Sequence, residues 1–204
     1  MTLSAIAINC SLKSGPEPSS TDAMIGLLVS ELKKHGVAFT ETIRIAQHDV
    51  KPGVTSDEGE GDAWPDIRRR ILAADILIFG TPIWVGQMSS LAQRVIERMD
   101  AFLSETDDAG RMPSFGKVAL VAVVGNEDGA HHVSGQLYQT LNDTGWTLAA
   151  GAVCYWTGEA MHKTDFRDLP AIPDKVSQTA AMAASNAAHL AALLKATAYP
   201  GLPG

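Results

Sequence analysis

Residues 76–86 of the chain read ILIFGTPIWVG, and this stretch is the most informative about the fold. Its first half, residues 76–80, is a continuous apolar run of strand length. A strand without polar alternation is buried on both faces, which is typical of a parallel sheet covered by helices on either side. Residues 81–89 then read as a loop, because Pro and Gly interrupt the apolar run. A helix is predicted to follow, up to about Leu103.

Four further apolar runs of strand length accompany this one, and helical patterns separate them. The predicted strands cover 3–9, 37–45, 116–124 and 146–155, and the other predicted helices cover 20–36, 66–73, 131–142 and 174–196. Strands that alternate with helices imply βαβ crossovers. Five such strands form a doubly wound parallel sheet in the order 2-1-3-4-5. We therefore expect a three-layer α/β sandwich, with residues 1–198 as one domain and 199–204 as a flexible tail.

The composition excludes several classes of protein. The 204 residues carry a net charge of −7 and no run of Lys or Arg, which argues against nucleic acid as a partner. No apolar stretch approaches the roughly 20 residues that span a bilayer, and the N-terminus does not read as a secretory signal. Cys10 and Cys154 form no disulfide framework. A cytoplasmic protein with no membrane partner is expected.

Three strand-to-helix loops should converge at one site. Ligands of a doubly wound sheet bind beyond the C-terminal ends of the strands, where the strand order reverses. The loop after the first strand carries Ser11, Lys13, Ser19, Ser20 and Thr21 directly before a helix. A helix N-terminus offers unpaired N–H groups and a positive dipole end, so it favours an anion such as phosphate. The alternative is that these hydroxyls are ordinary helix caps that need no ligand.

The other two loops suit a planar ligand. Trp84, between Pro82 and Gly86, offers a flat apolar wall on which a ring could stack, although a lone Trp equally well covers the edge of a core. Residues 125–130 contain glycines that permit close backbone approach and amides that could bond the edge of a heterocycle. The alternative for this loop is a plain connection, with Asp128 favoured near a helix start.

Other ligand signatures are missing from the sequence. No GxGxxG fingerprint follows the first strand, so a mononucleotide is favoured over a dinucleotide. Lys117 lies in no phosphate-binding P-loop, because the glycine spacing before it is one residue too long and a strand follows. His131 and His132 are adjacent, but no further ligand stands at metal-binding spacing, so no metal site is predicted.

Taken in order, the three loops resemble those of the flavodoxin-like NAD(P)H-dependent FMN reductases and their quinone-reductase relatives. Ser11-Leu12-Lys13 followed by Ser19-Ser20-Thr21 is similar to the family's Ser-x-Arg and Ser-Asn-Thr, with Lys for Arg, Ser for Asn and a longer insert. Residues 81–86, TPIWVG, look like the family's Thr-Pro-x-aromatic-x-Gly loop along the flavin ring. Residues 125–130, GNEDGA, look like the third loop, which meets the pyrimidine edge of the flavin.

The resemblance implies a flavodoxin-like fold and an FMN-binding oxidoreductase. Hydride would pass from NAD(P)H through FMN to a quinone, a flavin or a similar small acceptor, without an assigned catalytic side chain. A homodimer is usual in this family. The alternatives are a flavodoxin-type electron carrier without NAD(P)H turnover and a flavin-free interaction module. The residues implied in cofactor binding are Ser11, Lys13, Ser19, Ser20, Thr21, Pro82, Ile83, Trp84, Gly86, Gly125, Asn126, Glu127, Asp128 and Gly129.

Two long segments have the length of lids over such a site. Residues 47–61 are acidic and contain glycines, and residues 156–173 follow the last predicted strand. Trp84 and the stretch around Trp156 are the expected walls beside the ring. Linkers without a function are the alternative reading of both segments.

Overall fold

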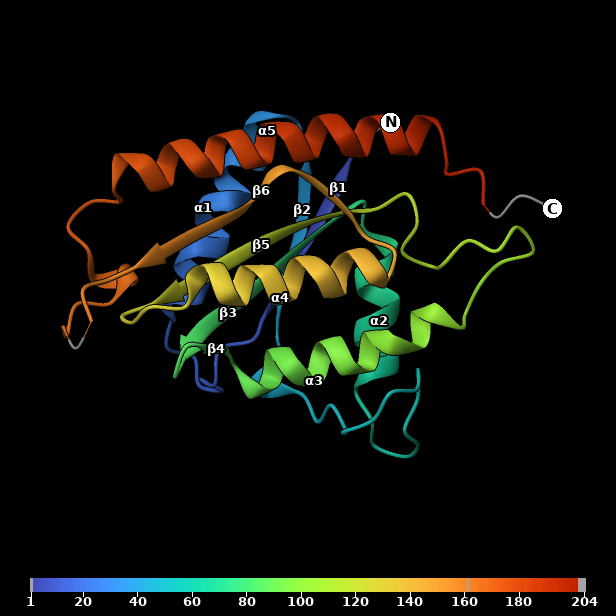
Figure 1. The fold of residues 1–204 in the computed structure, drawn as a ribbon, viewed down its shortest axis with the longest axis horizontal. Helices are drawn as coiled ribbons and strands as arrows, with labels where there is room; N and C mark the ends of the chain where they lie inside the picture. The colour runs from blue at the N-terminus through green and yellow to red at the C-terminus, as the bar shows by residue number, and fades with distance from the viewer. Residues whose placement is uncertain (1, 161, 202–204) are drawn as a thin grey trace.

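The five parallel strands of the sheet run in the spatial order β2-β1-β3-β5-β6 (Figure 1). The computed structural model describes residues 2–160 and 162–201. A short extra strand, β4, pairs antiparallel with β3. The predicted α/β class and the predicted order of the five parallel strands are confirmed. The strands are β1 (Ser4–Asn9), β2 (Ala38–Arg44), β3 (Ile76–Trp84), β4 (Gln87–Met88), β5 (Val118–Gly125) and β6 (Thr147–Thr157).

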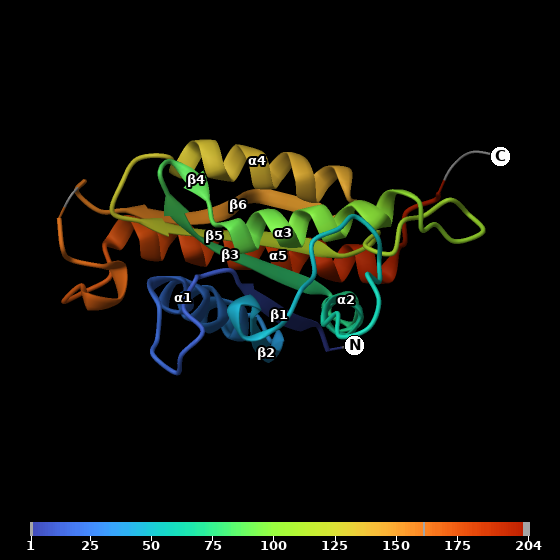
Figure 2. The same ribbon diagram turned by 90° about the horizontal axis from the view of Figure 1, so that it is seen from below.

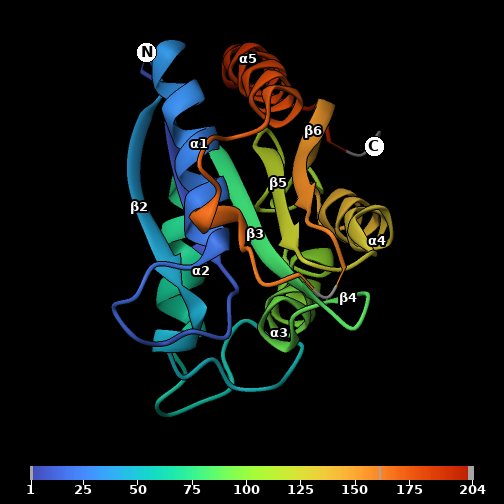
Figure 3. The same cartoon turned by 90° about the vertical axis from the view of Figure 1, so that its left-hand side faces the viewer.

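Helices cover both faces of the sheet (Figures 2 and 3). On one face lie α1 (Ser20–Lys34) and α5 (Asp174–Ala196). On the other lie α2 (Trp64–Ala73), α3 (Ser90–Met99) and α4 (Ala130–Asp143). The described residues also form three 3-10 turns: η1 (Ile45–Gln47), η2 (Asp100–Leu103) and η3 (Phe166–Asp168). Among the described residues, no helix combines the length and apolar character needed to cross a membrane.

The position of β3 in the middle of the sheet explains why its residues 76–80 are apolar throughout. Leu77 and Phe79 pack into the core under α2, α3 and α4, whereas Ile76 and Ile78 pack into the core under α1 and α5. All four side chains are fully buried. Since successive side chains of a strand point to opposite faces, a strand covered on both sides has no polar position.

The predicted loop 81–89 is wrong over much of its length, because β3 continues to Trp84. The chain then turns at Val85 and Gly86 and returns as β4, with Trp84 opposite Gln87. Val85 has φ +53° and Gly86 has φ +73°. A tight hairpin turn of this kind requires positive φ at both central residues, which a β-branched residue rarely adopts. Gly86 is a sequence signal for the turn, but Val85 is not.

Helix α1 begins at Ser20, as predicted, and its N-cap is Ser19. The Ser19 side chain accepts a hydrogen bond from the backbone N–H of Asp22, and the Asp22 carboxylate accepts one from the N–H of Ser19, which forms a capping box. The third helix ends at Met99 and continues as the 3-10 turn η2 rather than as α-helix to Leu103.

The remaining boundaries agree with the sequence to within one or two residues, and α5 has its predicted bounds. Part of the predicted flexible tail 199–204, namely 202–204, lies outside the described residues. Within them, the Tyr199 hydroxyl lies 2.9 Å from the Thr147 hydroxyl, and the Tyr199 ring packs on Phe115.

Candidate functional site

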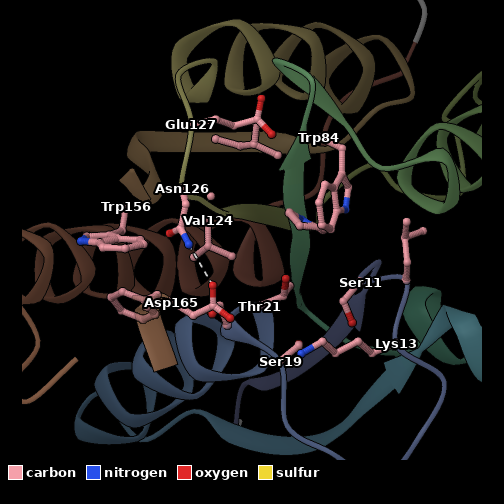
Figure 4. Close-up of a pocket in the computed structure, with 16 residues that line it drawn as sticks. Ser11, Lys13, Ser19, Thr21, Trp84, Val124, Asn126, Glu127, Trp156 and Asp165 are labelled. Atoms are coloured by element: carbon pink, nitrogen blue, oxygen red, sulfur yellow. Dashed lines mark hydrogen bonds between the residues drawn. The ribbon is translucent and has the colours of Figure 1, made fainter. Parts of the chain in front are cut away.

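A cavity of about 220 Å³ lies beyond the C-terminal ends of β1, β3 and β5 (Figure 4). β1 and β3 are the neighbouring strands at which the strand order reverses, the usual ligand position in this architecture. The lining consists of residues 11–13, 19–21, 82–84 and 124–127, together with Trp156, Asp165 and Phe166. Typical small-molecule pockets measure roughly 300–1,000 Å³. The Trp84 side chain is 54% exposed, so a larger ligand would extend past it into solvent.

Most of the residues predicted from the sequence meet in this cavity. All of them line it except Gly86, Asp128 and Gly129. A Cβ atom at Gly129 would lie 2.8 Å from the carbonyl oxygen of Gly86, so these two glycines let the β3–β4 hairpin and the third loop pack closely. Asp128 is exposed and accepts a hydrogen bond from the N–H of Gly129. These three residues therefore shape the loops beside the cavity.

One end of the cavity is formed by the N-terminus of α1. The Ser19 hydroxyl is fully engaged, because it accepts from Asn9 Nδ2 at 3.2 Å and from the N–H of Asp22 at 3.1 Å, and donates to Asp22. The Ser11 hydroxyl is buried and has no hydrogen-bond partner among the described residues. Buried hydroxyls are normally partnered. Ser11 therefore offers a free donor beside a helix N-terminus, which suits an anionic ligand.

Arg44 organises the loop that carries these hydroxyls. Its Nη1 donates to the carbonyl oxygens of Lys13, Gly15 and Glu17 at 3.3, 3.1 and 3.0 Å. Its Nη2 pairs with Asp22 at 2.5 Å, so the Arg44 charge is neutralised within the protein. The Lys13 side chain, in contrast, forms no ion pair with any described residue. Lys13 therefore supplies an available positive charge at this end.

The opposite end of the cavity is formed by Trp84 and the third loop. Glu127 accepts hydrogen bonds from the backbone N–H groups of Val85 at 3.0 Å and Gly86 at 2.9 Å, which ties the hairpin to the loop after β5. Figure 4 shows Trp84 and Asn126 on opposite sides of the cavity. An apolar ring wall and a polar loop thus face each other across the space.

The segment after β6, which belongs to the predicted lid 156–173, contributes lining residues that sequence reasoning did not name individually. Asp165 and Phe166 line the cavity, and the ring of Phe166 packs on Trp156 with centroids 5.6 Å apart. Trp156, expected as a wall, does line the cavity. Residues 47–61, the other predicted lid, contribute nothing to its lining. Asp165 carried no sequence signal, because its position depends on how a long loop folds back. Leu12 and Val124 are the other unassigned lining residues.

Cys10, His131 and His132 carry potentially reactive side chains. Burial raises the pKa of the Cys10 thiol far above its ordinary value, so Cys10, next to Ser11, carries no reactive thiolate. His131 Nε2 lies 3.0 Å from the Tyr155 hydroxyl, and His132 Nε2 lies 3.0 Å from Gln87. In the part of the chain that the structure describes, no group of three His, Cys, Asp or Glu side chains is placed to hold a metal ion.

Comparison with known proteins agrees with this geometry. The family model "NADPH-dependent FMN reductase" matches residues 3–159. The chain is 30% identical, over 98% of its length and 81% of the relative's, to 8-demethyl-8-aminoriboflavin-5'-phosphate synthase of Streptomyces davaonensis. It is 34% identical, over 96% of its length, to divalent metal cation transporter MntH of Mycobacterium bovis, but spans only 30% of that protein.

Among solved structures, the chain is similar to RosB with the bound intermediate 8-demethyl-8-formylriboflavin-5'-phosphate. The TM-score is 0.86 at 28% sequence identity, over 98% of this chain and 82% of that one. The match of the family model spans the sheet, all three loops and most of the cavity lining. The chain belongs to the NADPH-dependent FMN reductase family and is an FMN-binding oxidoreductase.

Proposed function

We propose that the cavity is the FMN site, with the phosphate at the N-terminus of α1 and the ring beside Trp84. The buried, unpartnered Ser11 hydroxyl carries this proposal, because an orphaned donor at a helix N-terminus matches a phosphate oxygen. The available charge of Lys13 and the helix dipole add to the attraction of a dianion. Trp84, at the other end, matches a flat ring.

The chain's own residues bind and orient the cofactor in this proposal. The hydrogen bonds that Arg44 donates to the loop carbonyl oxygens hold the phosphate end in shape before a ligand arrives, which reduces the entropy cost of binding. Glu127 holds the hairpin so that Trp84 stays at the ring position. Bound FMN supplies the hydride and electron chemistry.

We further propose that NAD(P)H is the electron donor and that a quinone, a flavin or a similar small molecule is the acceptor. Family membership supports the donor, and the exposed rim at Trp84 supports successive binding of both partners over one face. The homodimer and the cytoplasmic location expected from the sequence stay predictions.

A second candidate function treats FMN as the substrate that is chemically altered. It is favoured by the 30% identity to 8-demethyl-8-aminoriboflavin-5'-phosphate synthase and by the similarity to RosB, whose structure holds a formylated riboflavin phosphate. The same cavity would serve, because the phosphate and ring contacts are common to FMN and such derivatives.

One series of measurements tests these proposals. Titration of FMN should quench its fluorescence with a single flavin per chain, and anaerobic NADPH or NADH should bleach the bound flavin, which a quinone then reoxidises. FMN fluorescence that does not change on titration would contradict the site. Bleaching by dithionite but not by either nicotinamide would favour the electron carrier. A further incubation of the FMN complex with molecular oxygen and an amino-group donor, followed by mass measurement of the extracted flavin, then separates the two functions, since a cofactor keeps the mass of FMN and a converted substrate does not.

A further inference from the structure

Asp165 contributes a carboxylate to the wall of the cavity. It lies in the segment that follows β6 and lines the cavity with Phe166. Figure 4 shows its side chain between Asn126, at the ring end, and Thr21, at the phosphate end. Neither a helix cap nor the predicted family loops account for an acidic group at this point.

The position of Asp165 is fixed from several sides. Asn126 Nδ2 donates to Asp165 Oδ1 at 2.9 Å. The next residue, Phe166, is 3% exposed and packs on Trp156. Arg167 then joins the turn to the first loop, since its N–H donates to the Ser20 hydroxyl and its Nη1 donates to the carbonyl oxygen of Pro18 at 2.5 Å. The carboxylate is therefore held in place before any ligand binds.

The second carboxylate oxygen of Asp165 has no hydrogen-bond donor among the described residues. Arg167 Nε approaches it only to 3.9 Å, which is too long for a hydrogen bond. An ionised carboxylate only accepts hydrogen bonds. Within the cavity it can therefore accept a hydrogen bond from a ligand group that donates, and it repels a ligand group that is negatively charged.

The parts of FMN differ in what they offer to such an acceptor. The phosphate is anionic and brings acceptor oxygens, so it is disfavoured near Asp165. The ring system carries a single N–H group. The ribityl chain between them carries several hydroxyl donors. Because Asp165 lies between the two ends of the cavity, we infer that it is a specificity-determining residue that binds the ribityl hydroxyls, an inference that rests on the proposed FMN site.

The test compares three flavins that share the ring: FMN, riboflavin, which lacks the phosphate, and lumiflavin, which lacks the ribityl chain. Dissociation constants are measured by fluorescence, with lumiflavin measured by displacement of FMN. Asp165→Asn, which keeps the shape of the side chain, should weaken FMN and riboflavin alike, by about tenfold, because a hydrogen bond to a charged group is lost. Lumiflavin affinity should stay unchanged. Asp168→Asn, in the same turn but outside the cavity lining, is the matched control and should change none of the three.

Each other outcome overturns the inference. Tighter binding of FMN with unchanged binding of riboflavin would show that Asp165 acts only as a repulsive charge beside the phosphate. Equal weakening of the binding of all three flavins would show that Asp165 contacts the ring N–H or only supports the shape of the cavity. Unchanged affinities would show that Asp165 does not contact the flavin. A wild-type chain that binds no flavin would contradict the proposed FMN site itself. Far-UV circular dichroism of each variant confirms that the fold is retained.

Discussion

Glu127 Oε1 accepts a hydrogen bond of 3.0 Å from the backbone N–H of Val85, which has a positive φ of 53°. Among the described residues, Val85 alone combines a side chain with a positive φ. The bond therefore ties the strained tip of the β3–β4 hairpin to the loop after β5. Strain of this kind persists only where surrounding contacts hold it, and here it sets the position of the neighbouring Trp84.

Val85→Gly should raise the free energy of unfolding by about 0.5–1 kcal/mol. Relief of a left-handed conformation is worth about 1–2 kcal/mol, from which the greater freedom of glycine in the unfolded chain subtracts up to about 1 kcal/mol. The Val85 side chain is 89% exposed, so little packing is lost. Urea denaturation measures the change. Val54→Gly is the control, because Val54 is also exposed but has no positive φ, and it should give no increase. Equal destabilisation by both variants would contradict this account of Val85.

Asp62→Asn should lower the free energy of unfolding by about 3–5 kcal/mol, because it leaves a buried guanidinium without its counter-charge. Arg98 Nη2 lies 2.7 Å from Asp62 Oδ2, and both side chains are fully buried. Arg98 also donates to the carbonyl oxygens of Lys51 and Thr55, which shapes the segment 47–61. The double variant Asp62→Asn with Arg98→Met removes both charges and should lose less than Asp62→Asn alone. A larger loss in the double variant would show that the pair is not the cause.

The ion pair between Asp62 and Arg98 should make the stability of the protein sensitive to acid. Burial by itself would raise the pKa of Asp62, but the Arg98 guanidinium and the N–H groups of Glu58 and Trp64 outweigh it and hold the pKa well below its usual range. A carboxyl whose pKa is lower in the folded state contributes its full stability above the unfolded pKa of about 3.9, and loses it as the pH falls towards the folded value. The stability gap between wild type and Asp62→Asn should therefore narrow below about pH 4. Denaturation curves of both proteins at several pH values measure this gap. A gap that stays constant with pH would contradict the lowered pKa of Asp62.

The fold was predictable because the apolar pattern of a strand's own residues reflects whether its two faces are covered. Phe79 and Ile78 are apolar because both faces of β3 are covered. Burial on both faces therefore explains the continuous apolar run of residues 76–80. The convergence of Ser11, Trp84 and Asn126 followed in turn, because a doubly wound sheet brings the loops after β1, β3 and β5 to one edge.

What could not be predicted depends on contacts between residues far apart in the chain. Asp165 enters the cavity through a hydrogen bond to Asn126, 39 residues earlier. Val85 adopts its positive φ while Glu127, 42 residues later, holds it there. Local propensity reports neither contact, since valine disfavours such a turn and an aspartate in a long loop reads as a solvated charge.

Ser11→Ala and Ser19→Ala should separate ligand binding from helix capping. The Ser11 hydroxyl has no partner among the described residues, so Ser11→Ala should leave the free energy of unfolding unchanged. Ser11→Ala should weaken the binding of FMN about ten- to hundredfold, since a hydrogen bond to a charged group is worth roughly 1.5–3 kcal/mol. It should weaken the binding of riboflavin much less, because riboflavin lacks the phosphate. Ser19→Ala removes the N-cap of α1 and should cost about 1 kcal/mol of stability. Urea denaturation and titration of both flavins measure these effects. If Ser11→Ala weakened FMN and riboflavin equally, its hydroxyl would not contact the phosphate, and the phosphate would lie elsewhere in the cavity.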